Sequence, residues 1–172
     1  RPSVAWSRRV ALDYIRIDDR LIHGQVVVGW GQPCELGFLV LVDDAVVESE
    51  WEQELYRMGV PPEMDLYFDS VESAARRIAD YRADARAGML LVGDIATIAA
   101  LQARVPDIHT VTIGGIHHKE GRVPRLRYVF LTPQEEGELR ALADRGVTIV
   151  AQDVPSAAPI PLSDVLAGDG TG

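Results

Sequence analysis

RIDDRLIHGQVVVGW, residues 16–30, joins an expected β-strand to an expected helix through a short polar loop. The apolar run that leads into it ends abruptly at Asp18 and Asp19, and Gly24 precedes a segment, Gln25–Trp30, that can be helical. In open α/β folds a loop between a strand and the next helix lies at the carboxyl edge of the sheet, where such folds bind their ligands. The stretch therefore predicts an α/β fold with a site in this loop.

The loop holds an imidazole, a guanidinium and two carboxylates. His23 can act as a nucleophile, an acid, a base or a metal ligand near neutral pH, and Arg20 presents a planar fork of donors that suits a tetrahedral oxyanion. An Asp beside the imidazole, Asp18 or Asp19, can fix its tautomer, while Gly24 lets backbone amides approach an anion. These residues predict a histidine that accepts and passes on a phosphoryl group. The alternative is a surface Asp–Arg pair with an Asp capping the helix and His23 merely exposed.

Beyond the loop, short β-prone runs alternate with longer amphipathic segments. Strands are expected at 38–42, 66–68, 89–92, 111–113, 128–131 and 147–151, and helices at 49–58, 69–82, 95–104 and 132–145. Helices between successive strands imply right-handed crossovers and parallel pairing. We therefore expect a single-domain α/β fold, an open twisted, mostly parallel sheet of about seven strands with helices on both faces. An antiparallel edge strand could enter within 114–127 or at the end of the chain.

Local patterns support several of these helices. Asp69 and Glu72 have the spacing of a capping box, and so do Thr132 and Glu135, with a proline at the first helical position after Thr132. Apolar side chains recur at i, i+4 and i+7 in the segment 49–58: Trp51, Leu55 and Met58. This spacing is typical of an amphipathic helix.

Composition narrows the class of protein. The 172 residues suit one domain, and the net charge of −9 argues against nucleic-acid binding, which needs a basic surface. No apolar run approaches the roughly 20 residues needed to span a bilayer, so direct membrane insertion is not expected. The single cysteine, Cys34, excludes an internal disulfide framework and fits a reducing cytoplasm.

Two carboxylates follow another expected strand. Asp43 and Asp44 come after the run 38–42, so Asp43 could lie near His23 and orient its ring, or the pair could cap the next helix. Asp18, Asp19, His23 and Asp43 also allow a divalent-metal interpretation. Because Arg20 would compete with a cation in that loop, we do not expect a metal site.

A glycine pair and a basic loop follow the expected strand 111–113. Backbone amides at Gly114 and Gly115 could cradle a phosphoryl oxygen, or the pair could form a tight turn. The loop that follows, with His117, His118, Lys119 and Arg122, could contact a partner protein or be a solvated turn.

The eleven residues Arg16–Val26 resemble the active-site segment of the enzyme IIB component of the mannose/fructose/sorbose family of the bacterial sugar phosphotransferase system (PTS). Weaker similarity extends over about Leu12–Leu162, and we expect a IIB domain at 12–167 with terminal extensions at 1–11 and 168–172. Two positions depart from the family pattern, since Asp43 and Thr112 stand where the family generally has Asn.

This resemblance implies a phosphocarrier. His23 would accept a phosphoryl group from phosphohistidine on the IIA component and pass it to a sugar bound by the membrane components IIC and IID. Arg20 would clamp the phosphoryl oxygens. The labile P–N bond supplies the energy, so no cofactor is implied. The protein would be cytoplasmic and recruited peripherally to the membrane through IIC and IID, and a homo-oligomer is left open.

Two other functions remain open. A IIB-like regulatory protein would sense phosphorylation without moving sugar, and the departures at Asp43 and Thr112 are the sequence features that favour it. A small-molecule binding module of flavodoxin-like shape is the second alternative.

Overall fold

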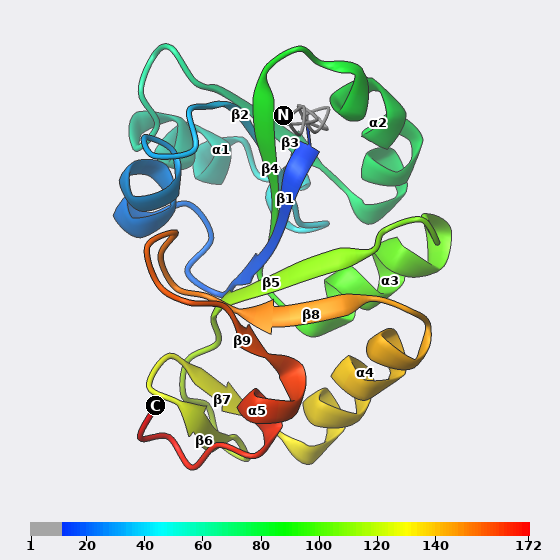
Figure 1. The fold of residues 1–172 in the computed structure, drawn as a ribbon. Coiled ribbons are helices and arrows are strands. Elements are labelled where there is room, and N and C mark those ends of the chain that lie inside the picture. The colour runs from blue at the N-terminus through cyan, green and yellow to red at the C-terminus, as the bar shows by residue number, and fades with distance from the viewer. Residues whose placement is uncertain (1–11) are drawn as a thin grey trace, which may run out of the picture.

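A seven-stranded sheet forms the centre of the protein in a computed structural model that describes residues 12–172 (Figure 1). The strands in spatial order are β3 (Asp65–Asp69), β2 (Leu36–Val42), β4 (Ala87–Val92), β1 (Leu12–Asp18), β5 (Thr110–Gly115), β8 (Thr148–Ala151) and β9 (Ile160–Pro161). Every neighbouring pair is parallel except β8 and β9. The mostly parallel sheet with one antiparallel edge strand confirms the predicted fold. The expected extension 1–11 lies outside the described residues.

Helices cover both faces of this sheet (Figure 1). They are α1 (Glu50–Met58), α2 (Val71–Ala83), α3 (Ile95–Arg104), α4 (Pro133–Asp144) and α5 (Leu162–Leu166), together with a π-helical turn at Gln25–Trp30 and a 3₁₀ turn at Val46–Glu48. Helices α2, α3 and α4 lie on one face, and α1 and the π-helical turn lie on the other. No helix in the part of the chain from 12 to 172 is long and apolar enough to cross a membrane.

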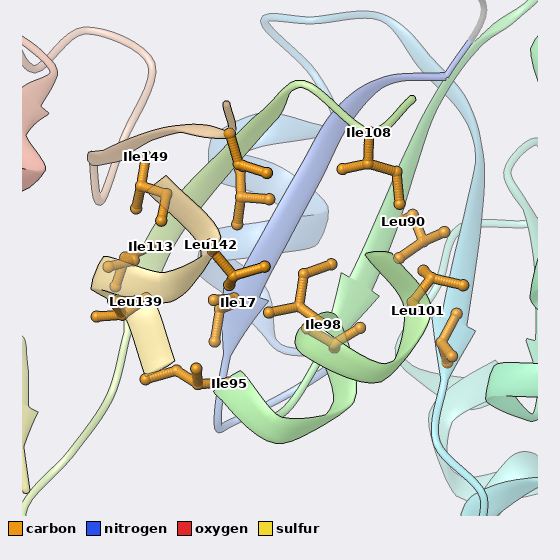
Figure 2. Close-up of a cluster of buried hydrophobic side chains, with 14 of the residues drawn as sticks. Ile17, Leu90, Ile95, Ile98, Leu101, Ile108, Ile113, Leu139, Leu142 and Ile149 are labelled. Atoms are coloured by element: carbon orange, nitrogen blue, oxygen red, sulfur yellow. The ribbon is translucent and has the colours of Figure 1, made fainter. Parts of the chain in front are cut away.

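The face under α2, α3 and α4 holds the larger hydrophobic core (Figure 2). Ile98 and Leu101 from α3, with Leu139 from α4, pack over strand residues such as Ile17 and Ile113. Because both faces of the central strands are buried, their sequences are almost continuously apolar, as parallel sheets require.

A second core lies under the π-helical turn. Val26, Val27 and Trp30 pack there against residues of β2 and β4, with Leu39 and Leu91 among them. Successive side chains of β1 point to opposite faces of the sheet. Ile15 and Ile17 therefore face the larger core. Tyr14 and Arg16 face the side that carries Trp30. Arg16 therefore enters the protein interior next to the end of β1.

Helix α1 confirms the expected segment, but its apolar stripe does not pack into the core. Trp51, Leu55 and Met58 are 70%, 57% and 83% exposed. The second core is instead completed by Val46 and Met64, which flank the helix in sequence, with Tyr56 as a partly buried neighbour from α1 itself.

The predicted strand 128–131 is not part of the main sheet. Its residues form β7 (Val129–Leu131), which pairs antiparallel with β6 (Val123–Leu126) in a separate two-stranded sheet. Beside β5 the neighbouring position is taken by β8. The backbone of Ile116, just after β5, exchanges hydrogen bonds with Tyr128 and Phe130, so this small sheet attaches at the end of β5.

Helix starts follow the predicted capping chemistry at Thr132 but not at Asp69. Thr132 and Glu135 form a complete capping box at α4. At α2 the cap is Ser70, whose hydroxyl accepts from the Ser73 amide. The Asp69 carboxylate is buried and accepts from Ser73, Arg77 and Tyr81 side chains instead, because the strand places it under the first turns of the helix.

The last residues of the chain contact the small sheet. The Gly170 amide donates to the Arg125 carbonyl, and the Arg127 amide donates to the Gly172 carbonyl, both at 3.1 Å. The domain boundary at residue 167 stays a prediction.

Candidate active site

The carboxyl ends of β1 and β5 meet where the strand connections diverge. The chain leaves β1 toward β2 on one side of the sheet, and leaves β5 for the small β6–β7 sheet and then β8 on the other. Asp18, the last residue of β1, pairs with Gly115 at the end of β5. Ligands of open α/β folds bind at such a switch point, and the predicted loop lies there.

The loop backbone holds His23 at this edge. The Leu21 amide donates to the Asp18 carbonyl at 3.0 Å, and Leu21 adopts a positive φ of 57°, which a branched side chain rarely does. The His23 carbonyl then accepts from the amides of Val26 and Val27, which lie within the π-helical turn, both at 3.0 Å. The backbone of His23 is thus held between two hydrogen-bonded turns.

Asp18 contacts the imidazole directly. His23 Nε2 lies 2.9 Å from Asp18 Oδ2, and the carboxylate is fully buried while the imidazole is 17% exposed. Burial raises the pKa of Asp18, but the hydrogen bond and charge of His23 and the backbone N–H of Arg20 outweigh it, so the pKa lies below its usual range. An ionised carboxylate only accepts hydrogen bonds, so Nε2 carries the proton. Nδ1 has no hydrogen bond to any residue within 12–172.

Arg20 lies beside the same carboxylate. Its amide donates to Asp18 Oδ1 at 3.1 Å and its Nε lies 3.4 Å from that atom, while Nη2 donates to Gln25 Oε1 at 2.6 Å. The side chain is 42% exposed. A half-exposed guanidinium next to the His23–Asp18 pair suits the predicted clamp, whose role stays a prediction.

Asp19 points away from His23. Its Oδ1 lies 2.6 Å from His117 Nδ1, and its Oδ2 accepts from the His117 amide at 2.6 Å. Of the two aspartates left open by the sequence, Asp18 is thus the one in contact with His23.

Arg16 was not predicted as a site residue, yet it supports Asp18. The Arg16 side chain is 1% exposed, and its guanidinium lies 3.6 Å from Asp18 Oδ2. The guanidinium donates to the carbonyls of Gln152 and Asp153 at 2.8 and 3.0 Å. It also lies 4.8 Å from the centre of the Trp30 ring. Burial lowers the pKa of this guanidinium, and the charge of Asp18 opposes that effect. An arginine at the end of an apolar strand was the signal that could have found it.

The two glycines after β5 differ in what surrounds them. A side chain at Gly114 would overlap the Arg16 guanidinium, so this glycine makes room for a buried cation. A Cβ at Gly115 would lie 3.2 Å from His117 Cε1, 3.4 Å from Asp18 Oδ1 and 3.6 Å from Arg20 Nη2. Only Gly115 therefore borders the space around Asp18 and Arg20. The phosphoryl cradle stays a prediction.

The remaining predicted residues have local contacts of other kinds. Asp43 Oδ1 accepts from the Ala45 and Val46 amides at 2.9 Å, and Asp44 Oδ1 accepts from the Val71 amide at 2.9 Å, so both carboxylates cap helical turns. Gly24 opens the π-helical turn and has no atom within 4 Å of its Cβ position. Within residues 12–172 no group of three or more His, Cys, Asp or Glu is placed to hold a metal ion.

Comparison with known proteins assigns the chain to a family. Residues 12–171 match the family described as PTS system sorbose subfamily IIB component. The N-acetylgalactosamine-specific phosphotransferase enzyme IIB component 1 of Escherichia coli is 32% identical over 143 residues, which cover 81% of this chain and 89% of that protein. A probable phosphotransferase enzyme IIB component of Streptococcus pyogenes is 28% identical over 158 residues, which cover 88% of this chain and 97% of that protein. The crystal structure of the IIB domain of the sorbose permease from Klebsiella pneumoniae has a TM-score of 0.80 at 27% identity and covers 90% of this chain and 94% of that one.

Proposed function

Given that the chain belongs to the sorbose subfamily of PTS IIB components, we propose that it is a phosphocarrier that takes a phosphoryl group onto His23 from a phosphorylated IIA component. It then passes the group to a sugar held by membrane components IIC and IID, at the cytoplasmic face of the membrane. Residues 12–167 form the IIB domain in this proposal.

The observation that carries the proposal is the 2.9 Å contact between His23 Nε2 and buried Asp18. Because Asp18 holds the proton on Nε2, Nδ1 keeps its lone pair and is the nucleophile. It attacks phosphorus as the P–N bond of the donor breaks, and the bonding pair returns to the donor imidazole. The His23 ring becomes a phosphoimidazolium, whose positive charge Asp18 balances.

Arg20 neutralises charge on the phosphoryl oxygens. Phosphoryl transfer depends mainly on positioning and charge neutralisation, since little covalent chemistry is left for the protein. The half-exposed guanidinium lies next to the His23–Asp18 pair. The charge of Arg16, on the buried side, adds to the effect of His23 and the Arg20 N–H in lowering the pKa of Asp18. In the second transfer Nδ1 leaves as a neutral imidazole, because Nε2 retains its proton.

Incubation with phosphorylated IIA tests this function. Acid-labile phosphate should appear on the protein and should be absent from His23→Ala. Membranes containing IIC and IID should then release it as sugar phosphate. A His23→Ala protein that still takes up phosphate refutes the assignment of the nucleophile, and phosphate that reaches His23 but never sugar would show a regulatory sensor instead.

A further inference from the structure

A second histidine lies close to the site and has a carboxylate partner of its own. His117 Nδ1 lies 2.6 Å from Asp19 Oδ1, and the His117 amide donates to Asp19 Oδ2 at 2.6 Å. Because a carboxylate accepts hydrogen bonds, Nδ1 carries a proton, and in the neutral ring Nε2 then holds a lone pair. An Asp–His pair with this tautomer is the arrangement of a general base.

This histidine lies close to Asp18 and Arg20, two residues of the proposed phosphoryl site. The Cβ position at Gly115 is within 3.6 Å of His117 Cε1, Asp18 Oδ1 and Arg20 Nη2. Cε1 lies between the two ring nitrogens, so this edge of the His117 ring borders Gly115, next to Asp18 and Arg20. The His117 side chain is 45% exposed, which leaves access for an incoming molecule.

The loop that carries His117 is anchored by an ion-pair chain. Arg122 donates to the His117 carbonyl at 2.7 Å and pairs with both Glu135 oxygens at 2.9 Å, and Glu135 closes the capping box of α4. Arg122 also lies 3.8 Å from Asp19. His118, by contrast, is exposed, and its ring packs in a T-shaped arrangement with the Phe130 ring. These contacts hold the loop in place at His117, and its choice between a partner contact and a solvated turn stays a prediction.

We propose that His117 is the catalytic base for transfer of the phosphoryl group from His23 to the sugar. A sugar hydroxyl oxygen attacks phosphorus as the Nδ1–P bond of His23 breaks, and the bonding pair returns to the imidazole. The hydroxyl proton passes to His117 Nε2, and Asp19 stabilises the resulting imidazolium. The proton is then lost to water through the exposed edge of the ring.

This inference rests on the proposed function and predicts that its two half-reactions differ. Loading of His23 from a phosphohistidine releases no hydroxyl proton, so it needs no base. Transfer to a hydroxyl does. Removal of His117 should therefore slow the second step while leaving the first nearly unchanged.

The test uses His117→Asn, whose amide can still donate to Asp19 but has no lone pair at the position of Nε2, together with His117→Gln. His118→Asn is the matched control. We expect loading of His23 by phosphorylated IIA within about threefold of wild type in all three, and sugar phosphate formation slowed about 10²- to 10⁴-fold in the His117 variants only.

Sugar transfer within threefold of wild type in both His117 variants would overturn the inference. So would equal losses in both half-reactions, because His117 would then be a structural residue. Failure of the wild-type protein to be loaded, or to pass phosphate to sugar, would instead refute the proposed function itself. The wild-type protein, measured in the same assay, therefore distinguishes failure of the inference about His117 from failure of the proposed function.

Discussion

Gly114→Ala should destabilise the protein because of one buried cation. A Cβ at this position would lie inside 3.0 Å of three guanidinium atoms of Arg16. Those atoms cannot give way easily, because they donate to the carbonyls of Gln152 and Asp153 and stack on Trp30. The added methyl therefore either expels Arg16 from its slot or displaces the backbone of β5.

The structure sets the size of the effect. Expulsion of Arg16 breaks two hydrogen bonds from a charged group, each worth about 1.5–3 kcal/mol, and displacement of the strand would cost about 1–3 kcal/mol as overpacking. Because the protein takes the less costly of these two routes, we expect Gly114→Ala to lower the free energy of unfolding by about 1–3 kcal/mol.

Urea denaturation followed by circular dichroism measures this quantity. Gly137→Ala is the matched control, because Gly137 lies inside α4 with no atom within 4 Å of its Cβ position, and alanine there should stabilise by about 0.5–1 kcal/mol. If Gly114→Ala unfolds within 0.5 kcal/mol of wild type, Arg16 is not held as described.

Other variants test the same arrangement. Asp18→Asn can donate to His23 Nε2 and so place the proton on Nδ1, which should slow loading of His23 by about 10²-fold or more; an unchanged loading rate would contradict the tautomer argument. Since the folded pKa of Asp18 lies below its ordinary 3.8, this carboxylate stabilises the fold fully above that pH. The difference in the free energy of unfolding between wild type and Asp18→Asn should thus shrink as pH falls below 3.8. A difference that stays constant down to pH 2 in urea titrations would contradict the lowered pKa of Asp18. Trp30→Phe removes the donor to the Asp153 carbonyl at 2.8 Å and should cost about 1–2 kcal/mol in the same unfolding assay, whereas no loss would show that the bond contributes nothing.

The fold was largely predictable because apolar runs and their spacing decide it. Strands buried on both faces stand out as continuous apolar segments, and the Thr132 cap marked α4 correctly. The strand 128–131 was placed in the wrong sheet, since sequence periodicity does not say which neighbour a short strand pairs with. Asp69 was mistaken for a cap because its burial under α2 depends on tertiary contacts with Arg77 and Tyr81.

The site was predictable where its residues are consecutive. The loop from Asp18 to His23 carries a local pattern, and the structure brings Asp18, Arg20 and His23 together. Arg16 and the pairing of Asp19 with His117 were missed. They depend on the register of β1 with β5 and on a contact between two loops that are 98 residues apart in the sequence. Asp43, which the sequence could have placed near His23, caps a turn two strands away from β1.

Phosphorus and nitrogen NMR of the loaded, ¹⁵N-histidine-labelled protein tests the central claim most directly. The account predicts one phosphohistidine, at His23, with phosphorus bonded to Nδ1 and a proton retained on Nε2 facing Asp18. A phosphoryl group on Nε2 of His23, or on another histidine, would contradict it.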